Sequence, residues 1–201
     1  MAHWDVLGSL FDFDVPEGFR YQPDFVTAEE EAALAHDIAG VEFSTFEMHG
    51  VIAKRRVAFF GMSYGTGGAA TTPVPPFLLS LRDKVATWAA LAPDAFAMAL
   101  INEYVPGAPI GWHRDAPQYD IVAGVSLLSS CRMKFRPYRR PGEPSGGRRS
   151  ATHDVPLERR SAYLLTGPSR TAYEHHIPPA AGLRYSVTFR TLRASSRRVA
   201  R

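Results

Sequence analysis

The sequence predicts an all-β core with flanking helices (α+β), folded as a double-stranded β-helix, or jelly roll. From Phe96 to Leu192 the chain is a series of short apolar segments separated by Pro and Gly, at the spacing expected for two packed sheets. Two segments with helical periodicity precede this region. The 201 residues, 45% of them apolar, are enough for one sizeable core and argue for a single domain.

The chain is expected to divide into an extension, a core and a tail. Residues 1–95 form an N-terminal extension with helices and a substrate lid, in one structural unit with the jelly-roll core at 96–192, and 193–201 form a basic tail. Within the extension, residues 1–26 carry many aromatic and acidic side chains without a clear period. This pattern predicts an extended arm that lies over the core.

Two helices are predicted in the extension. Thr27 and Glu30 have the spacing of a capping box, which begins a helix that ends at Gly40. Pro75-Pro76 begins a second helix, which stops before Pro93. Its apolar face is expected to pack on the outside of a sheet and consists of Phe77, Leu81, Val85 and Trp88.

Between the two helices, residues 41–64 have the pattern of short strands and contain candidate substrate-binding residues. Arg55 and Arg56 precede an apolar stretch that leads to Tyr64. Cations interleaved with aromatic side chains suit a nucleotide, because a flipped base needs a stacking partner and its phosphates need positive charge. The alternative is an ordinary hairpin in which Phe59 is buried.

The core is expected to contain several short strands and one long loop. The loop, 136–150, is rich in Pro, Gly and Arg, and either grips a nucleic-acid backbone or is a solvent-exposed linker. The expected strands are 96–105, 120–128, 131–136, 151–155, 161–166, 172–177 and 183–192.

The pattern His113-x-Asp115 predicts part of a metal site, although a surface turn explains this triplet equally well when it is taken alone. A histidine and a carboxylate two residues apart point to the same side of an extended chain. A second histidine from a distant strand would complete the two-histidine, one-carboxylate set that suits iron(II). His175 and His176 alternate across their strand, so only one of them can face the metal, and the residues alone leave the choice open.

The last predicted strand has one polar and one apolar face. Because side chains alternate along a strand, Tyr185, Val187 and Phe189 share the apolar face. The polar face carries two arginines and is therefore not expected to be core. It consists of Arg184, Ser186, Thr188 and Arg190.

These features together resemble the AlkB-type branch of the iron(II)- and 2-oxoglutarate-dependent dioxygenases. The resemblance covers about residues 55 to 192, and its most specific part is the Arg-x5-Arg spacing in RYSVTFR. The sequence departs from the pattern at Ser186, where some members carry asparagine, and the N-terminal part matches loosely. The matching residues are Asn102-x-Tyr104 with Pro106-Gly107, His113-x-Asp115, Val125-Ser126-Leu127, Ser169-Arg170, His175-x-Ile177 and Arg184-x5-Arg190.

The resemblance implies a set of cofactors and the residues that hold them. The His-x-Ile pattern selects His175, which would bind Fe(II) together with His113 and Asp115. Arg184 would pair with the distal carboxylate of the cosubstrate 2-oxoglutarate, assisted by Asn102 and Tyr104. Arg190 would act near the metal, and O2 would be the oxidant.

The resemblance also implies an activity, which is the oxidative demethylation of N-alkylated bases such as 1-methyladenine and 3-methylcytosine in DNA or RNA, as in DNA repair. Trp112, Tyr64 and Tyr119 are aromatic candidates near the pocket. One alternative is a dioxygenase of the same fold that acts on a protein or a small molecule. Another is a catalytically silent jelly roll that binds nucleic acid, which the intact set of matching residues argues against.

Composition limits the compartment and the partners. The segment from Arg132 to Arg170 contains ten Arg or Lys against three acidic residues, within a net charge of +3, which favours a polyanionic partner but also fits a solvated basic surface. Cys131 is the single cysteine, so an internal disulfide is excluded. No signal peptide or membrane-spanning segment is recognisable, and we therefore expect a cytoplasmic monomer without a membrane partner.

Overall fold

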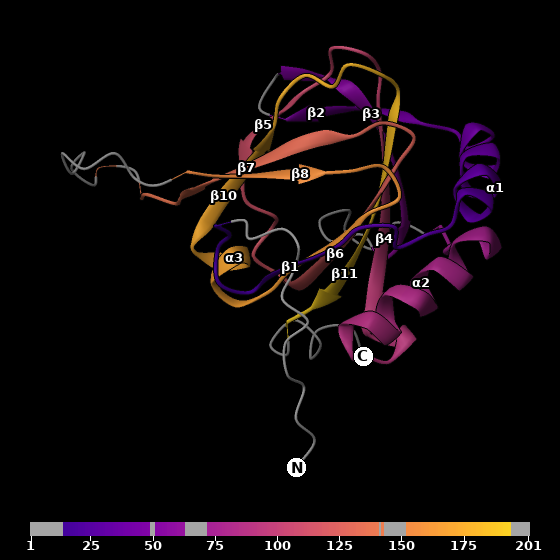
Figure 1. Cartoon of the computed structure of the whole chain (residues 1–201), viewed down its shortest axis with the longest axis horizontal. Helices are drawn as coiled ribbons and strands as arrows, with labels where there is room; N and C mark the ends of the chain where they lie inside the picture. Colours follow the sequence, from indigo (N-terminus) through magenta and orange to yellow (C-terminus); the bar gives the residue numbers. More distant parts are fainter. Residues whose placement is uncertain (1–13, 49–50, 63–71, 141, 143–151, 194–201) are drawn as a thin grey trace.

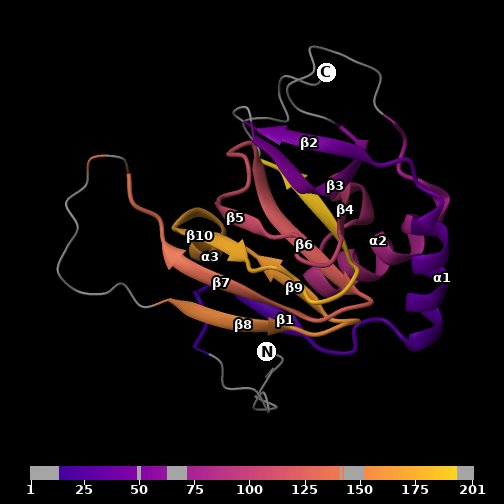
Figure 2. The same ribbon diagram turned by 90° about the horizontal axis from the view of Figure 1, so that it is seen from above.

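The computed structural model describes residues 14–48, 51–62, 72–140, 142 and 152–193, and these form two antiparallel sheets that pack face to face (Figures 1 and 2). The seven strands of the larger described sheet lie in the order β1 (Phe19–Gln22), β9 (Ala162–Leu165), β6 (Tyr119–Leu127), β11 (Arg184–Leu192), β4 (Phe96–Tyr104), β3 (Val51–Gly61) and β2 (Ser44–Met48). The four strands of the smaller described sheet lie in the order β5 (Ile110–His113), β10 (Tyr173–Ile177), β7 (Cys131–Pro137) and β8 (His153–Leu157). The predicted jelly-roll fold is confirmed.

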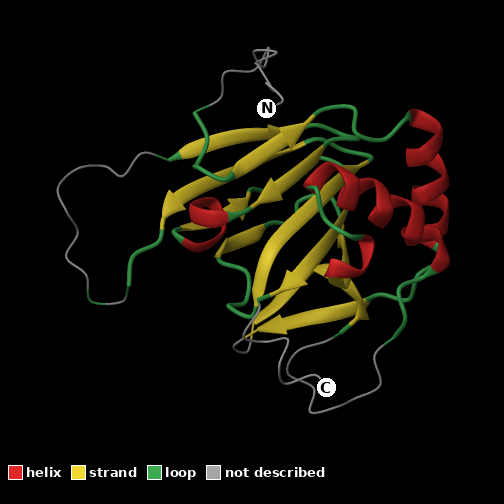
Figure 3. Cartoon of the chain, turned by 90° about the horizontal axis from the view of Figure 1, so that it is seen from below, coloured by secondary structure: helices red, strands yellow, loops and turns green. Residues whose placement is uncertain are grey.

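Two helices cover the outer face of the larger sheet, on the side away from the smaller one (Figures 2 and 3). Helix α1 (Ala28–Ala39) begins with the predicted capping box, in which Thr27 and Glu30 exchange both hydrogen bonds. Helix α2 (Pro76–Ala89) begins at the predicted proline and buries Leu81 and Val85. A 3₁₀ turn, η1 (Pro93–Ala95), leads from α2 into β4.

The two faces of the larger sheet differ in what they contact, as the side chains of β11 show. Its residues Tyr185, Val187 and Phe189 belong to the apolar core under α1 and α2, as the alternation predicts. Its polar residues face the smaller sheet, yet every residue of β11 is buried, because this central strand is covered on both sides. The polar face is buried but does not belong to the apolar core, in line with the expectation, and its residues Ser186, Thr188 and Arg190 line an internal cavity.

Besides η1, three short elements were not predicted from the sequence. Strand β1 pairs with β9 at the edge of the larger sheet, so this part of the expected arm is an integral strand, whereas residues 1–13 lie outside the described residues. Strand β5 carries the His113 segment, and α3 (Gly167–Thr171) precedes β10. Most of the basic loop at 136–150 also falls outside the described residues.

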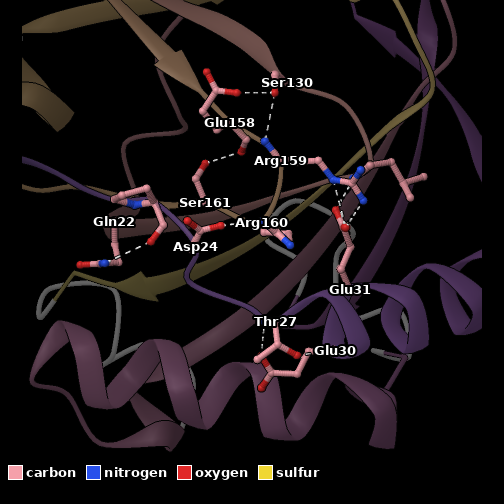
Figure 4. A network of polar contacts seen from close by, with 12 residues as sticks. Gln22, Asp24, Thr27, Glu30, Glu31, Ser130, Glu158, Arg159, Arg160 and Ser161 are labelled. Carbon is pink, nitrogen blue, oxygen red and sulfur yellow. Dashed lines mark hydrogen bonds and ion pairs between the residues drawn. The ribbon is translucent and has the colours of Figure 1, made fainter. Parts of the chain in front are cut away.

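A buried carboxylate fixes α1 to two turns of the jelly roll (Figure 4). Glu31 is 2% exposed, accepts a hydrogen bond from the backbone N–H of Leu128 at 2.7 Å, and pairs with the guanidinium of Arg159. Leu128 and Arg160 both have positive φ, at 71° and 64°, so these turns hold backbone conformations that L-residues rarely adopt. We infer that Glu31 holds the β6–β7 and β8–β9 turns in place.

Replacing Glu31 with glutamine is expected to lower the free energy of unfolding by about 2 kcal/mol. The two carboxylate oxygens of Glu31 accept hydrogen bonds from Leu128 and Arg159, whereas the neutral glutamine amide has only one oxygen that can accept. Urea denaturation measures this change. The matched control is Glu42→Gln, at an exposed position, which is expected to change stability by less than about 0.5 kcal/mol. Equal stabilities of the two variants would contradict this role of Glu31.

Within the described residues, the helices of the chain are too short or too polar to cross a bilayer.

Candidate active site

A cavity of about 400 Å³ lies between the two sheets. The polar face of β11 forms one wall with inward side chains of β3 and β4, while β5 and β10 from the smaller sheet form the opposite wall. The register between β11 and β4 determines which side chains are neighbours on this wall, because Ser186 lies opposite Asn102 and Thr188 lies opposite Leu100. Most of the residues that the sequence singled out therefore meet in one chamber.

The structure brings His113, Asp115 and His175 together at this cavity. His113 and His175 are opposite one another on the paired strands β5 and β10, and their ring centroids are 4.3 Å apart. The carboxylate oxygen Oδ2 of Asp115 lies 3.8 Å from Nε2 of His175. Segments that are about sixty residues apart in the sequence thus place two imidazoles and one carboxylate side by side.

The protonation states of the two histidines suit metal binding. Burial lowers the pKa of His113, and burial together with the neighbouring His113 lowers the pKa of His175 to about 3, so both rings are neutral at pH 7. Nδ1 of His113 lies 2.8 Å from the carbonyl oxygen of Gly111. Because a carbonyl can only accept, Nδ1 carries the hydrogen, and Nε2 keeps its lone pair for a metal.

His176 lies on the opposite face of β10. Its Nδ1 is 2.9 Å from the carbonyl oxygen of Ile110, and its ring packs against Trp112 at a centroid distance of 4.9 Å. His175 is 6% exposed and lines the cavity, whereas His176 does not line it. Of the two histidines, His175 therefore faces the cavity beside His113 and Asp115, and His176 faces away from it.

Two arginines hold the carboxylate in position. Nε and Nη2 of Arg190 donate to Oδ1 of Asp115 at 2.9 and 2.8 Å, and Nη1 donates to the hydroxyl of Thr188. Arg170 donates from Nη2 to the carbonyl oxygens of Ala116 and Tyr119, on either end of the turn that follows Asp115. Burial alone would raise the pKa of Asp115, but the charge of Arg190 holds it well below its usual range, so the group is a carboxylate.

The chemistry of these three side chains fits iron(II), which takes two imidazoles and one carboxylate on one face. The described part of the chain contains no three His, Cys, Asp or Glu side chains that are already arranged around a single point for a metal ion. Oδ1 of Asp115 accepts two hydrogen bonds from Arg190. His113 and His175 already lie opposite one another on paired strands. The three side chains could therefore surround an ion by changing their side-chain torsion angles, without a change in strand pairing.

Arg184 has the properties of a binding residue for an anion. It is fully buried, its Nε donates to the hydroxyl of Ser126 at 2.9 Å, and its guanidinium lies 5.1 Å from the centre of the Tyr104 ring. Nη1 and Nη2 are buried and have no hydrogen-bond partner among the described residues. A buried, unpaired guanidinium is costly, and a carboxylate offsets that cost with two parallel hydrogen bonds.

Asn102 and Tyr104 line the cavity next to this arginine, which itself lies behind the cavity wall. Both come from β4, and Tyr104 is the direct cross-strand neighbour of Arg184. Burial raises the pKa of Tyr104, so its hydroxyl stays protonated and can donate to an anion. The end of the cavity at Tyr104 therefore suits a carboxylate, with Arg184 as the counter-charge.

The predicted substrate-binding residues have different positions. Arg55 and Tyr119 line the cavity, and Arg55 donates to the amide oxygen of Asn102 at 3.2 Å. Arg56 points to the other face of β3 and pairs with Glu103. Two further predicted residues are Trp112, which lies outside the cavity against His176 and Arg136, and Tyr64, which lies outside the described residues.

Phe59 is exposed over 40% of its surface and lines the cavity from β3. The alternative in which an ordinary hairpin buries this ring is therefore wrong. An exposed aromatic ring on the lining of a cavity offers a flat apolar surface to a ligand. This placement agrees with the hypothesis that the 41–64 segment contacts the substrate.

Tyr163 is a cavity residue that the sequence did not single out. It is 5% exposed on β9, and its ring lies so close to Gly124 that a Cβ atom there would meet the ring at 2.3 Å. Gly124 is thus required by the close approach of a neighbouring strand. Gly124 and Tyr163 are far apart in the sequence, so their pairing could not be predicted from it. The alternation of side chains within the predicted strand 161–166 was the one available indication of the face of the strand on which Tyr163 lies.

Comparisons with known proteins agree with this geometry. The family model of the 2OG-Fe(II) oxygenase superfamily matches residues 18–190. The chain is similar to an Arabidopsis thaliana protein named "Alkylated DNA repair protein ALKBH8 homolog", with 30% identity over 95% of this chain and 59% of that protein. It is also similar to the Danio rerio "Probable RNA/DNA demethylase ALKBH6", with 25% identity over 82% of this chain and 70% of that protein.

Solved structures show the same fold at low sequence identity. The structure of OsALKBH1 has a TM-score of 0.64 at 14% identity and covers 87% of this chain and 98% of its own. A Pseudomonas putida prolyl-4-hydroxylase has a TM-score of 0.56 at 17% identity and covers 88% of this chain and 94% of its own. From the family match, the fold and the relatives, the chain belongs to the 2OG-Fe(II) oxygenase superfamily, as a member of the AlkB type.

Proposed function

We propose that the chain oxidatively demethylates N-alkylated bases, such as 1-methyladenine and 3-methylcytosine, in DNA or RNA, with release of formaldehyde, succinate and CO2. The oxygenase part rests on the shared cavity, which is lined by His113, Asp115, His175 and Tyr104. Behind Tyr104 lie the buried Nη1 and Nη2 of Arg184, which have no hydrogen-bond partner among the described residues. The names of both relatives support the nucleic-acid part. The chain spans 59% of the length of the Arabidopsis protein.

Each polar group of the cavity then has a task. His113, Asp115 and His175 hold Fe(II), which when bound activates O2 with electrons from 2-oxoglutarate. Arg184 binds the distal carboxylate of 2-oxoglutarate, assisted by Tyr104 and Asn102. Arg190 fixes the carboxylate of Asp115, while Tyr119 and Tyr163 form aromatic walls that exclude water around the target methyl group.

The decisive experiment measures formaldehyde release from single-stranded oligonucleotides that carry 1-methyladenine or 3-methylcytosine, with Fe(II) and 2-oxoglutarate present. We expect release with the wild type and none with His113→Ala or Arg184→Ala. Succinate formation without any release from nucleic acid would leave the oxygenase and point to a protein or small-molecule substrate. Neither product from a folded, iron-loaded protein would leave a catalytically silent nucleic-acid-binding module.

Substituting Phe59 with alanine is expected to raise KM for the methylated oligonucleotide about 5- to 150-fold, because stacking on one aromatic ring stabilises a bound base by about 1–3 kcal/mol. The KM for 2-oxoglutarate is expected to stay unchanged. Leu79→Ala is the control, since Leu79 is a similarly exposed apolar residue on α2. An oligonucleotide KM that does not respond to Phe59→Ala would remove this ring from the substrate site.

A further inference from the structure

A second hollow, of about 550 Å³, adjoins the active-site cavity. The two share the segment His113–Ala116, so a molecule in the hollow lies next to the metal-binding residues. Three guanidinium groups line it, from Arg114, Arg170 and Arg193, together with the ring of Tyr138. We call it the arginine hollow, and the proposed function assigns it no task.

Each of these arginines is held in place by part of its hydrogen-bonding capacity. The guanidinium of Arg114 lies 3.4 Å from the centre of the Tyr138 ring, and its Nη1 donates to the carbonyl oxygen of Thr171 at 3.2 Å. Nε of Arg193 donates to the carbonyl oxygen of Tyr119 at 3.2 Å. A guanidinium has five N–H donors, and among the described residues these two groups use one each. The remaining donors of Arg114 and Arg193 make no hydrogen bond to the described residues.

Arg170 adds a buried charge to the floor of the hollow. It is 4% exposed, and its Nε has no hydrogen-bond partner among the described residues. Burial lowers the pKa of Arg170, the charge of Asp115 opposes this lowering, and the like charges of Arg193, Arg190 and Arg114 add to it. Several guanidinium groups crowded into one hollow repel one another, and an anion would relieve that repulsion.

The acidic residues of the hollow are already engaged by other arginines. Asp115 accepts two hydrogen bonds from Arg190, and Glu174 pairs with Arg136. The hollow therefore keeps a surplus of positive charge from Arg114, Arg170 and Arg193. Rigidly held guanidinium groups with spare donors match the oxygens of a phosphate, which they bind in a bidentate manner.

We propose that the arginine hollow binds a phosphodiester group of the nucleic-acid strand beside the target nucleotide. This proposal rests on the proposed function, and it names the contact that distinguishes an oligonucleotide from a free nucleoside. The hollow lies beside His113 and Asp115, so a bound phosphate fixes the strand close to the metal while the base enters the cavity. The contact is to the backbone and carries no information on base sequence.

The test measures the fluorescence anisotropy of a labelled single-stranded oligonucleotide. We expect Arg193→Gln and Arg114→Gln each to weaken binding about five- to tenfold, and the slope of log K against log salt to fall by about 0.7 for each arginine removed. The matched control is Arg82→Gln on α2, at the far side of the larger sheet, which is expected to keep the wild-type affinity and slope. Wild-type affinity and slope in both hollow variants would overturn the proposal.

Turnover measurements on two substrates distinguish the failure of the phosphodiester site from the failure of the demethylase activity. Arg193→Gln is expected to lower kcat/KM on the methylated oligonucleotide and to leave kcat/KM on the methylated nucleoside, which has no phosphate, unchanged. An equal loss on both substrates would overturn the backbone contact while the demethylase remains. If the wild type demethylates nothing, the proposed function fails, and the anisotropy series still tests the hollow. Binding of inorganic phosphate that depends on these arginines, without any effect on the oligonucleotide, would show a free-anion site instead.

Discussion

Replacing His175 with alanine is expected to abolish iron-dependent turnover, whereas replacing its neighbour His176 is expected to preserve it. His175 faces the cavity beside His113 and Asp115, while His176 hydrogen-bonds the carbonyl oxygen of Ile110 on the other face. Loss of an outer hydrogen-bond partner of a metal ligand already weakens metal binding about 10- to 100-fold, so loss of the ligand itself should exceed about 100-fold.

The two histidine variants form a matched pair, because they remove the same side chain from adjacent positions of β10. Metal affinity is measured by titration with Co(II), which is stable in air, and turnover by succinate formation with Fe(II). His176→Ala should cost about 1 kcal/mol of stability through its lost hydrogen bond and little else. The reverse result, with turnover lost only in His176→Ala, would assign the ligand to the other histidine.

Replacing Arg184 with methionine is expected to raise KM for 2-oxoglutarate about 30-fold or more. Removing one partner of a buried, hydrogen-bonded charge pair costs about 2–5 kcal/mol. The stability of the protein without 2-oxoglutarate is expected to change little, because two effects oppose each other. Methionine removes a buried charge whose Nη1 and Nη2 have no partner among the described residues, and it also removes the hydrogen bond from Nε to Ser126. The same substitution is thus expected to weaken cosubstrate binding without weakening the free protein.

Thermal unfolding with and without 2-oxoglutarate tests both halves of this expectation. At a concentration of 100 times Kd, the cosubstrate should add about 2.7 kcal/mol to the wild type and nothing measurable to Arg184→Met. Arg184→Lys keeps the charge and loses the planar fork, so it should show an intermediate KM. If Arg184→Met binds 2-oxoglutarate as the wild type does, the carboxylate is held elsewhere in the cavity.

Local sequence signals determined much of the fold. The capping box at Thr27 fixed the start of α1, and Pro76 fixed the start of α2, because these signals act within one helical turn. The period of two along β11 separated its apolar face from its polar one, since alternation is a property of an extended backbone. The strands of the core were predicted within a few residues, apart from β5, which is short and begins after a turn.

Only the tertiary structure decided which face of several strands points inward. Alternation states that adjacent residues face opposite ways, and strand pairing determines which of them enters the cavity. Arg55 enters it and Arg56 does not, because β3 pairs with β4 in the register that places Val57 opposite Asn102. His175 enters it through its pairing with His113.

The same limit applies to residues that the sequence passed over. Glu31 reads as an ordinary helical surface residue, yet it is buried against two turns that lie about a hundred residues further along the chain. Tyr163 became a cavity residue through its contact with Gly124. The sequence by itself determined the elements and the chemical types of the site, because these depend on neighbouring residues. The tertiary structure decided which side chains meet, because register and sheet packing join segments that are far apart in the chain.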